Sequence, residues 1–261
     1  MNNDKFESEM RKYELYHSIK VCDGSYPIIR VDGRSFSALT EKHYIKPFDI
    51  NFHDVMTHVT KTLLDELDGV YAFTESDEIS ILLKRDTNLF DREVEKLVSI
   101  SASIASVAFS IKSGIQGYFD ARIWVGTSEP KVVDYFRWRQ SDTTRCALNG
   151  WAYWTLRTAG YSARKASSIL DQKSIDDKLK ILFDYVIDFE TVPAWQRFGT
   201  GLYWETYIKD GFNPITSQVV KVPRRMIKTD ENLPSREAYS KFISDILGAE
   251  SRDSVTIGFN S

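Results

Sequence analysis

The sequence predicts an α+β fold of two layers, and three observations lead to this class. Short apolar runs alternate with longer segments whose apolar residues recur every three or four positions, a pattern typical of strands and amphipathic helices. In the first half of the chain these segments follow the order strand, helix, strand, strand, helix, strand. Turn-forming Asp, Ser and Gly residues separate them. We therefore expect a split βαβ, or ferredoxin-like, core.

The first strand and the first core helix come after a short polar helix predicted over residues 5–16. The apolar stretch Ile28–Val31, ended by Asp32-Gly33, indicates a buried strand that runs into a tight turn. A helix is then predicted to begin after Asp49, a suitable N-cap, and to stop at Gly69. Its inward face has apolar residues at three- and four-residue spacing, namely Phe52, Val55, Met56, Val59, Leu63 and Leu67.

A hairpin, a second helix and a fourth strand complete this core. The hairpin strands are expected at Val70–Thr74 and Ile79–Lys84, with Glu75–Glu78 as the turn. The helix is expected over Asp91–Lys112 and the last strand over Phe119–Val125. The inward residues of that helix are expected to be Val94, Leu97, Val98, Ile104, Val107, Ala108 and Ile111. The resulting βαββαβ order is that of polymerase-like and cyclase-like palms.

The second half of the chain is expected to be a mixed helical and β-ribbon extension over residues 128–261, packed on a palm domain of residues 1–127. A long helix begins at Ser128-Glu129-Pro130 and stops at Gly160, and Ser162 caps a further short helix. The remaining elements are a helix over Asp177–Tyr185, ribbon strands at Gly201–Lys209 and Ser217–Val222 around a turn at Asp210–Pro214, and a final helix over Pro234–Leu247 ended by Gly248.

The amino-acid composition indicates which class of protein this is. The chain has 261 residues with 42% hydrophobic and 27% charged residues, which is typical of a soluble globular protein. A net charge of −3 argues against a broadly basic nucleic-acid coat but leaves room for a local basic surface. Two cysteines cannot form a disulfide framework or a zinc cluster. The longest apolar run, near residues 99–111, is short for a membrane span, and the N-terminus is polar, so we expect a cytoplasmic protein with no membrane partner.

Two carboxylate-bearing turns are the candidate site. Asp32-Gly33 ends the first strand, and Ser76-Asp77-Glu78 is the tip of the hairpin between the second and third strands. The first and third strands of a split βαβ sheet are neighbours, so the hairpin tip can approach the end of the first strand. Two carboxylates and a backbone carbonyl would then suit Mg²⁺. A pair of such ions about 4 Å apart can activate an attacking oxygen and stabilise a leaving one.

Gly33 supports this interpretation, because a residue without Cβ lets the backbone approach a metal or phosphate. The amides of Arg34, Ser35 and Phe36 are candidates for an anion-binding nest. Each feature also has an ordinary structural interpretation. Asp-Gly after a strand is usually a turn, and Ser-Asp-Glu is usually a hairpin tip, so only their joint placement favours a catalytic site.

Several multi-residue motifs resemble the tRNA(His) guanylyltransferase family, in order, from about Arg11 to Trp204. They are Arg30-Val-Asp-Gly-Arg-Ser-Phe36, Glu41-Lys-His-Tyr-Ile-Lys-Pro-Phe-Asp49, Ser76-Asp-Glu78, Phe119-Asp-Ala-Arg122, Trp138-Arg-Gln-Ser-Asp142 and Pro193-Ala-Trp-Gln-Arg-Phe-Gly-Thr200. The resemblance implies a polymerase-like palm that adds nucleotides to the 5′ end of tRNA in the 3′-to-5′ direction. It also implies a homotetramer that uses ATP and GTP or other nucleoside triphosphates.

The resemblance further implies roles for individual residues. Asp32, the Gly33 carbonyl and Asp77 would bind two Mg²⁺ ions, with Glu78 as an adjoining catalytic carboxylate. The residues expected to contact the nucleotide are Asp32, Gly33, Arg34, Ser35, Phe36, Ser37, Lys46, Asp49, Ser76, Asp77 and Lys96. Lysines at such positions can neutralise phosphate charge.

Two departures from the family pattern point to one of its branches. Members that place a single guanylate on tRNA(His) carry His-Ile-Asn-Asn-Leu-Tyr-Asn where this chain has Thr144–Gly150, and Ser37 stands at a position that is often His. The chain thus resembles the guanylyltransferase-like branch associated with template-dependent repair of 5′-truncated tRNAs. Dedicated tRNA(His) maturation is the alternative.

A basic set in the second half is expected to contact RNA phosphates: Arg137, Arg139, Arg145, Arg157, Arg164 and Lys165. Trp138, Trp151 and Trp154 are interleaved with them and offer stacking surfaces. The alternative is that these tryptophans belong to the core and the arginines to a solvated face.

Two other classes of function fit parts of the sequence. A cyclase-like palm enzyme without an RNA substrate would share the fold, but the Gly-Gly-Asp/Glu-Glu-Phe hairpin typical of diguanylate cyclases is absent from the sequence. A non-catalytic tRNA-binding module would not need both Asp32 and Asp77.

Overall fold

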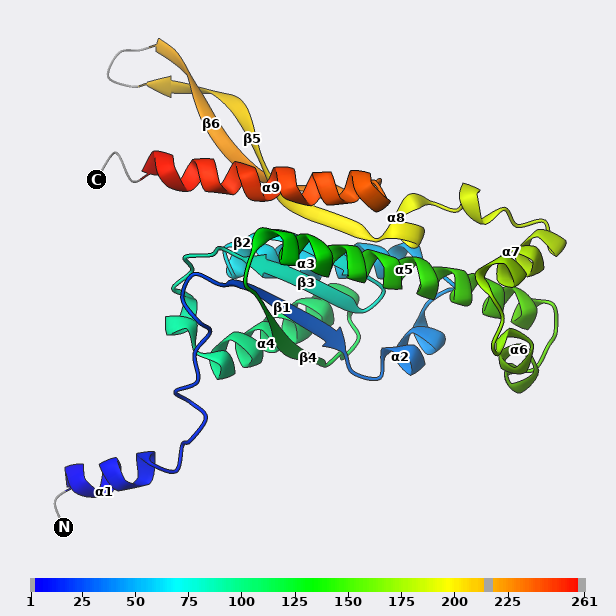
Figure 1. Cartoon of the computed structure of the whole chain (residues 1–261), viewed down its shortest axis with the longest axis horizontal. Coiled ribbons are helices and arrows are strands. Elements are labelled where there is room, and N and C mark those ends of the chain that lie inside the picture. The colour runs from blue at the N-terminus through cyan, green and yellow to red at the C-terminus, as the bar shows by residue number, and fades with distance from the viewer. Residues whose placement is uncertain (1–2, 214–217, 258–261) are drawn as a thin grey trace.

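A six-stranded antiparallel sheet lies at the centre of the protein, whose computed structural model describes residues 3–213 and 218–257 (Figure 1). The strand order is β4-β1-β3-β2-β5-β6, and neighbouring strands are antiparallel. The strands are β1 (Tyr26–Gly33), β2 (Gly69–Glu75), β3 (Glu78–Leu83), β4 (Phe119–Gly126), β5 (Thr200–Asn213) and β6 (Gln218–Asp230). The α+β class predicted from the sequence is confirmed.

The first half of the chain follows the predicted βαββαβ order. β1 lies between β4 and β3, so the first and third strands are central neighbours as expected. The short helix α2 is additional to the prediction. The helices of this half are α1 (Asn3–Arg11), α2 (Phe36–His43), α3 (Ile50–Glu66) and α4 (Val94–Ser113), with a 3₁₀ turn, η1, at Leu89–Arg92.

Asp49 caps α3 as its sequence predicts. Its carboxylate accepts hydrogen bonds from the backbone amides of Asn51 at 2.7 Å and Phe52 at 3.3 Å. The end of the helix differs from the prediction, because Gly69 is already the first residue of β2. The chain leaves the helix through Asp68, which has a left-handed φ of 46°.

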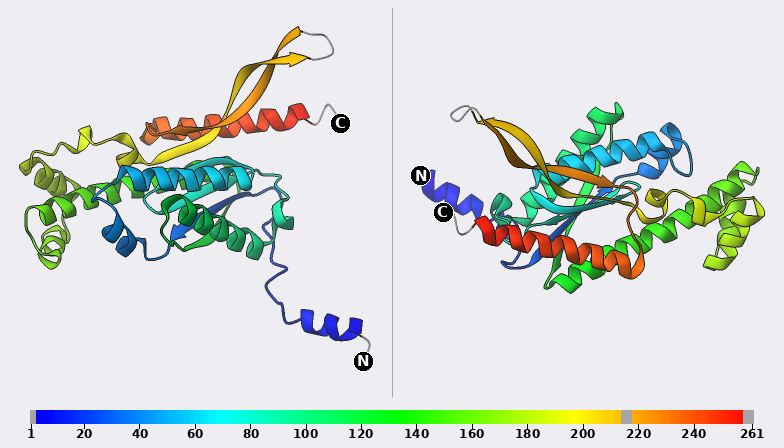
Figure 2. Two further views of the ribbon diagram at one scale, coloured as in Figure 1. Left: turned by 180° about the vertical axis from the view of Figure 1, so that it is seen from behind. Right: turned by 90° about the horizontal axis from the view of Figure 1, so that it is seen from above.

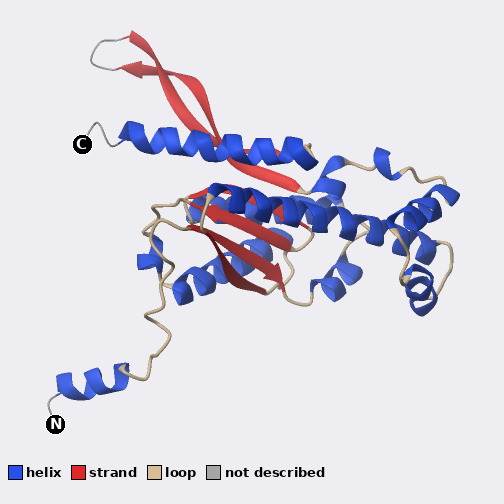
Figure 3. Ribbon diagram, in the orientation of Figure 1, coloured by secondary structure: helices blue, strands red, loops and turns tan. Residues whose placement is uncertain are grey.

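Helices cover both faces of the sheet and form three layers, where the sequence predicts two (Figure 2, Figure 3). One face is packed by α3 and α4, and the other by α5 (Glu129–Thr158) and α9 (Arg236–Ile257). The first interface buries Ile29, Val31, Val59, Leu63, Ile81 and Phe109, and the second buries Ile28, Tyr71, Phe73, Phe136, Tyr239 and Ile243. The third layer arises because α5 and α9 each bury an apolar stripe on the open face of the palm sheet.

Helix α4 begins later than predicted and buries a different stripe. Asp91 belongs to η1, and the helix starts at Val94. Val107 and Ile111, predicted to face inward, are 58% and 78% exposed. The buried positions are Leu97, Ser101, Ala105, Ala108 and Phe109, and Ser101 fits because its hydroxyl donates to the Leu97 carbonyl. By length and composition this 20-residue helix could cross a membrane, although here it packs on the sheet.

The long helix of the second half matches its prediction. α5 begins after Ser128, and Gly160 follows it with a φ of 93°. Ser162 caps the next helix through the Lys165 amide. The later elements of this lobe are α6 (Ala163–Leu170), α7 (Ile175–Asp184), a 3₁₀ turn η2 (Phe189–Thr191) and α8 (Ala194–Phe198).

The β-ribbon is longer than predicted and belongs to the palm sheet at its base. Strand β5 pairs with β2 from Tyr71↔Tyr203 to Thr74↔Thr200, then continues with β6 away from the other strands (Figure 1). Asp210–Asn213, predicted as part of the turn, pair with β6; residues 214–217 lie outside the described residues. Helix α9 also runs past Gly248 to Ile257, and its buried residues Tyr239, Ile243 and Leu247 come before the glycine.

Candidate active site

The end of β1 and the tip of the β2–β3 hairpin come together as the topology predicts. Asp32 pairs across the sheet with Glu78, and the Gly33 amide donates to the Asp77 carbonyl at 3.2 Å. The hairpin turn itself contains only Ser76 and Asp77. Two aspartates far apart in the sequence therefore lie at one end of the sheet.

Gly33 allows this close approach. A Cβ at residue 33 would lie 2.9 Å from the Cβ of Asp77 and 2.5 Å from the ring of Phe36. Ser76 supports the other side of the contact, since its backbone has a left-handed φ of 49° and its hydroxyl donates to Asp77 Oδ1 at 3.1 Å. The turn is thus held against the bare backbone of β1.

The site concentrates negative charge. Burial first, and then the charge of Asp32, raise the pKa of Asp77 to about 6, while Lys46 opposes the shift. Burial likewise raises the pKa of Glu75 to about 8, with the charge of Glu78 as the next cause. Asp32 has Arg122 as a distant cationic neighbour, whose Nη2 lies 3.8 Å from Oδ2. Such a cluster favours a bound cation.

The donor set fits Mg²⁺. Within the described residues no group of three or more His, Cys, Asp or Glu side chains is arranged to hold a metal. Mg²⁺ needs no such group, because it usually takes one or two carboxylates and completes its shell with water and substrate phosphates. The raised pKa of Asp77 beside Asp32 and the cradle at Gly33, which a Cβ would fill, are consistent with this ion.

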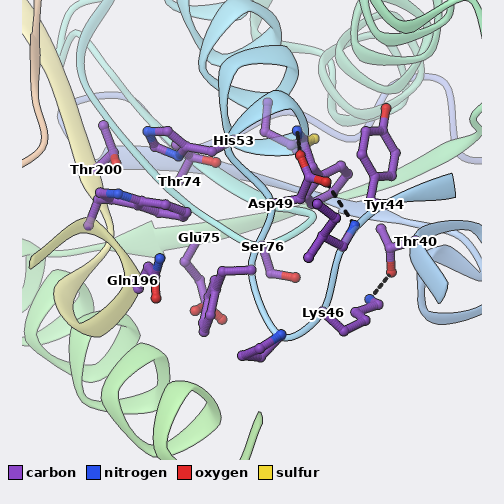
Figure 4. Close-up of a pocket in the computed structure, with 16 residues that line it drawn as sticks. Thr40, Tyr44, Lys46, Asp49, His53, Thr74, Glu75, Ser76, Gln196 and Thr200 are labelled. Atoms are coloured by element: carbon purple, nitrogen blue, oxygen red, sulfur yellow. Dashed lines mark hydrogen bonds between the residues drawn. The ribbon is translucent and has the colours of Figure 1, made fainter. Parts of the chain in front are cut away.

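A pocket opens beside the turn (Figure 4). His53 stacks on Trp195 with ring centres 4.2 Å apart, and Phe48 meets Trp195 edge-on at 5.7 Å. His53 belongs to α3, Phe48 to the loop before it and Trp195 to α8. Both halves of the chain therefore contribute to this aromatic wall of the pocket. The polar lining consists of Thr40, Tyr44, Lys46, Asp49, Thr74, Glu75, Ser76, Gln196 and Thr200.

Lys46 is the cation of this pocket. Its ammonium group donates a hydrogen bond to Oγ1 of Thr40, a residue of α2. Burial lowers the pKa of Lys46, whereas the charges of Glu41 and Asp77 oppose that shift. The structure therefore brings this predicted phosphate ligand towards the carboxylate turn.

Asp49 lines the same pocket but has a structural role. One carboxylate oxygen accepts from the Ile45 amide at 2.7 Å, and the other caps α3. Burial opposes ionisation, yet these backbone hydrogen bonds lower the pKa of Asp49 overall. Both its oxygens thus hold the loop that carries Lys46, and a direct contact of Asp49 with the nucleotide stays a prediction.

Replacing Asp49 with alanine is expected to lower the free energy of unfolding by about 1–2 kcal/mol, because the helix cap and the Ile45 contact are lost together. Urea denaturation measures this change. Asp54→Ala, at an exposed position of the same helix, is the matched control and should change stability by less than about 0.5 kcal/mol. Equal effects of the two substitutions would contradict the assignment.

The segment after Gly33 forms only part of the predicted anion nest. The Arg34 amide already donates to the Tyr118 carbonyl at 2.8 Å, so this amide is not free for phosphate. The Phe36 side chain is buried among Phe52, Phe109 and Phe119. Ser35 and Ser37 are exposed at the start of α2, and Ser35 has a left-handed φ of 61°.

Lys96 lies far from the site in the same chain. It pairs with Glu93 at 2.8 Å near the start of α4, which is tied to Ile19 ahead of β1. The site lies beyond the other end of that helix, about 25 Å along its axis from Lys96. The prediction that Lys96 contacts the nucleotide is wrong for this chain's own site, because Lys96 is in the first turn of α4 and the site is near the last turn.

Glu78 pairs with a buried arginine of α5. Arg139 Nε donates to Oε1 at 2.6 Å and Nη2 donates to Oε2 at 2.9 Å. Arg139 is only 4% exposed. The prediction that Arg139 contacts RNA phosphates is corrected, because this arginine is buried. The catalytic role of Glu78 stays a prediction.

The other predicted RNA contacts are more accessible. Arg164 and Lys165 are exposed on α6. Arg137 and Arg145 have side chains 44% and 62% exposed, and each pairs with a carboxylate, Glu237 and Asp142 respectively. Arg157 is half-buried over Tyr153 and Trp154. These positions remain candidates for an RNA-binding surface.

The three tryptophans divide between surface and core. Trp138 is 52% exposed, whereas Trp151 packs near Phe48 and donates to Gln196 Oε1 at 3.1 Å. Trp154 is half-buried. Of the three, only Trp138 is more than half exposed, so it is the best candidate for stacking on a base.

Glu75 lies in the predicted turn but is not among the site residues that the sequence predicts. Its pKa is higher in the folded chain than the ordinary 4.5, so its contribution to stability is complete below pH 4.5 and is lost as pH rises through about 8. Glu75→Gln is therefore expected to be more stable than the wild type at pH 8, on the order of 2 kcal/mol, and equal to it near pH 4.5. Urea denaturation across this range, with exposed Glu95→Gln as control, checks the result; a pH-independent difference would contradict it.

Comparisons with known proteins agree with this geometry. A family model described as tRNAHis guanylyltransferase matches residues 7–127, and one described as the Thg1 C terminal domain matches residues 130–247. A probable tRNA(His) guanylyltransferase of Bos taurus is 31% identical over 232 residues, covering 82% of this chain and 76% of the relative.

Two solved structures share the fold. The crystal structure of the Saccharomyces cerevisiae tRNA(His) guanylyltransferase has a TM-score of 0.67 and 25% identity, covering 74% of this chain and 90% of that chain. A bacterial Thg1-like protein in complex with ATP has a TM-score of 0.73 and 22% identity, covering 92% of this chain and 98% of that chain. Given the match to the bovine relative and the two family models, the chain belongs to the tRNA(His) guanylyltransferase family.

Proposed function

We propose that this chain adds nucleotides to the 5′ end of tRNA in the 3′-to-5′ direction and takes its base choice from the opposing strand. The observation that carries the proposal is the hydrogen bond from the Gly33 amide to the Asp77 carbonyl, which joins the two aspartate-bearing segments. Family membership supplies the tRNA substrate class. A cyclase-like activity has no support beyond the shared palm.

The proposed metal ligands are Asp32, the Gly33 carbonyl and Asp77, for two Mg²⁺ ions. When bound, these ions would polarise the reacting phosphate and stabilise the attacking and leaving oxygens. The two aspartates supply the negative charge that holds them. Burial and the charge of Asp32 already raise the pKa of Asp77 in the metal-free chain, and a divalent cation would reverse that repulsion.

ATP and GTP, or other nucleoside triphosphates, are the proposed nucleotide substrates. In this proposal Lys46 balances triphosphate charge, and the aromatic side chains of His53, Phe48 and Trp195, which line the same pocket, accept a base. The backbone of Ser35 and Ser37 at the start of α2 is a further candidate for phosphate contacts.

The proposed reaction has two in-line transfers. First, an oxygen of the tRNA 5′-monophosphate attacks the α-phosphorus of ATP; a new P–O–P linkage forms, the α–β anhydride bond breaks and pyrophosphate leaves. Then the 3′-hydroxyl of an incoming nucleoside triphosphate attacks the activated 5′ phosphorus, losing its proton, and AMP leaves. A 5′-triphosphorylated tRNA would not need the first step. The two transfers have the same geometry, so one site can position both.

Repair of 5′-truncated tRNA is the proposed task, and addition of one guanylate to tRNA(His) is the second candidate. The residues Thr144–Gly150 depart from the tRNA(His) pattern and form part of α5. There Thr144 Oγ1 donates to the Arg197 carbonyl at 2.9 Å and Ala147 and Leu148 are buried. This part of the window therefore has packing roles in place of the family's polar residues.

The test is incubation with Mg²⁺, ATP, labelled nucleoside triphosphates and a tRNA that lacks its first nucleotide. We expect a 5′ extension whose base changes when the opposing base is changed. Addition of guanylate alone, to tRNA(His) alone, would favour the second candidate. If the wild type extends no tRNA, or if Asp32→Ala matches its rate, the proposed function is wrong.

We also propose a cytoplasmic homotetramer. Exposed apolar residues on α4 and the projecting ribbon are surfaces that other subunits would cover, including Val107, Ile111, Ile208 and Phe212. Light scattering should give four times the 30.1 kDa mass of the chain. A monomeric mass at micromolar concentration would contradict this.

A further inference from the structure

The hairpin tip that carries Asp77 has few anchors of its own. Glu75 and Glu78 pair to close the hairpin, and the Gly33 amide adds one backbone hydrogen bond to Asp77 at 3.2 Å. Ser76 occupies left-handed backbone space, which a serine adopts at some energetic cost. An additional constraint is needed to fix the Asp77 side chain to within a fraction of an ångström.

The bidentate pair of Glu78 with Arg139 supplies such a constraint. Glu78 is the residue next to Asp77, and its two oxygens are held by Arg139 at 2.6 and 2.9 Å. The side chains of the pair are 14% and 5% exposed. Bidentate arginine–carboxylate contacts fix orientation as well as distance. The first residue of β3 is thus tied to α5.

Arg139 is itself held on three sides. Its Nη2 donates to Asp142 at 3.1 Å, and its guanidinium lies 4.7 Å from the ring centre of Trp138. The next residue, Gln140, donates to the Pro234 carbonyl at 2.9 Å, which fastens this turn of α5 to the segment before α9. The Arg139 side chain is therefore fixed relative to α5, and it fixes Glu78 relative to the same helix.

A second arginine lies close to the Glu78 carboxylate. Arg30 of β1 places Nε 3.8 Å from Glu78 Oε2, and its guanidinium lies 5.6 Å from the ring centre of Trp138. Arg30 is two residues before Asp32 in β1, so its positive charge lies close to the hairpin tip. One carboxylate is thus shared between β1 and α5, the two elements on either side of it.

Charge gives the second reason for the pair. Asp32, Asp77 and Glu78 lie together at one end of the sheet, and Arg139 is a buried cation in direct contact with this group of carboxylates. Removing one partner of a buried pair leaves an uncompensated charge and is costly. Arg139 keeps the carboxylates close enough for a shared metal site.

We propose that Arg139 is a positioning residue that acts through Glu78 to hold Asp77 in its metal-binding geometry. The inference deepens the proposed function and depends on its metal site. Neither residue needs to touch substrate. Second-layer contacts of this kind typically change metal affinity by about 10–100-fold.

The test combines metal binding with kinetics. Mn²⁺ replaces Mg²⁺ as the probe, and its affinity is measured by electron paramagnetic resonance on the full chain. Arg139→Gln and Glu78→Gln are each expected to weaken Mn²⁺ binding at least about tenfold and to lower kcat by a similar factor. KM for tRNA should change by less than about twofold. Arg139→Lys should recover part of the loss, because one contact to Glu78 survives.

The double variant separates this role from two independent effects. If Arg139 acts through Glu78, Arg139→Gln combined with Glu78→Gln should bind Mn²⁺ no worse than the weaker single variant. Multiplied losses would mean that the residues act independently and would overturn the proposal.

Arg92→Gln is the matched control for loss of a buried arginine. Arg92 is 6% exposed and donates to the carbonyls of Val21 at 3.0 Å and Thr87 at 2.9 Å, at the far end of β1. We expect reduced thermal stability with unchanged Mn²⁺ affinity. A similar loss of affinity in this control, or Mn²⁺ binding within about twofold of wild type in Arg139→Gln, would overturn the inference.

The metal readout also distinguishes this inference from the proposed function. A wild-type chain that binds Mn²⁺ at Asp32 and Asp77 but extends no tRNA would contradict the reaction, and the Arg139 comparison would still decide the positioning role. If the Asp32→Ala variant binds Mn²⁺ as tightly as the wild type, both the proposed function and the positioning role of Arg139 are wrong.

Discussion

Replacing Asp77 with asparagine is expected to reduce nucleotide addition at least about 1,000-fold, since loss of a metal ligand removes several kcal/mol of transition-state stabilisation. Asp32→Asn should have an effect of the same size, because the two aspartates supply the only charged ligands in the proposed set. Single-turnover extension of a 5′-truncated tRNA at saturating ATP measures this rate. A residual rate within about tenfold of wild type would mean that Asp77 does not hold the reacting metal.

The same variant is expected to be more stable than the wild type in the absence of metal. The pKa of Asp77 rises from its ordinary 3.8 to about 6 in the folded chain, first through burial and then through the charge of Asp32. A raised carboxyl pKa means that stability is complete below pH 3.8 and is lost as pH rises through about 6. An asparagine side chain cannot ionise, so the variant should gain on the order of 1 kcal/mol at pH 7 after allowance for solvent screening.

Urea denaturation in EDTA at pH 4 and pH 7 checks this difference. The variant should match the wild type at the lower pH and exceed it at the higher one. Asp54→Asn, at an exposed position on α3, should change neither activity nor the pH dependence. Loss of activity accompanied by loss of stability at pH 7 would indicate a structural role for Asp77 instead.

Gly33→Ala is the second change with a large expected effect. The added Cβ would meet the Phe36 ring at 2.5 Å and the Asp77 Cβ at 2.9 Å, and neither neighbour can move freely. Phe36 is fixed in a cluster with Phe109 and Phe119, so the hairpin tip must shift. We expect at least about a 100-fold fall in extension rate, because a displacement of about 1 Å at a reacting centre costs that much. Overpacking should also cost about 1–3 kcal/mol of stability.

Gly248→Ala is the control for the substitution itself. Nothing lies within 4 Å of a Cβ built at Gly248, which is inside α9. Alanine there should stabilise the helix by up to about 1 kcal/mol and leave the extension rate unchanged. If Gly33→Ala retains wild-type activity, the close approach of β1 to the turn is not needed for the reaction.

The palm could be predicted from the sequence because its signals are local. Hydrophobic periodicity located α3, and the capping preference of aspartate located its start at Asp49. The β1–β3 neighbourhood then followed from the βαββαβ order alone, and with it the approach of Asp32 to Asp77. These steps need only residues within one element and a topology rule.

The parts that could not be predicted depend on distant pairing. Nothing around Arg139 indicates that it will meet Glu78, 61 positions earlier in the chain, and an arginine in a basic helix is usually at the surface. The position of half-buried Lys46 in the loop between α2 and α3, and that of Lys96 in the first turn of α4, depend on how these segments pack in the folded chain. β5 extends the palm sheet through pairing with β2, a contact between segments far apart in the chain.

The most direct test is a crystal structure of the wild-type chain with Mn²⁺ and a non-hydrolysable ATP analogue, using anomalous scattering to locate the ions. We expect two ions about 4 Å apart, ligated at about 2.1 Å by Asp32, the Gly33 carbonyl and Asp77, with the analogue's phosphates completing their shells. Glu78 should remain on Arg139. Ions bound by Glu75 or Glu78 instead, or triphosphate density away from Lys46 and the turn, would contradict the account.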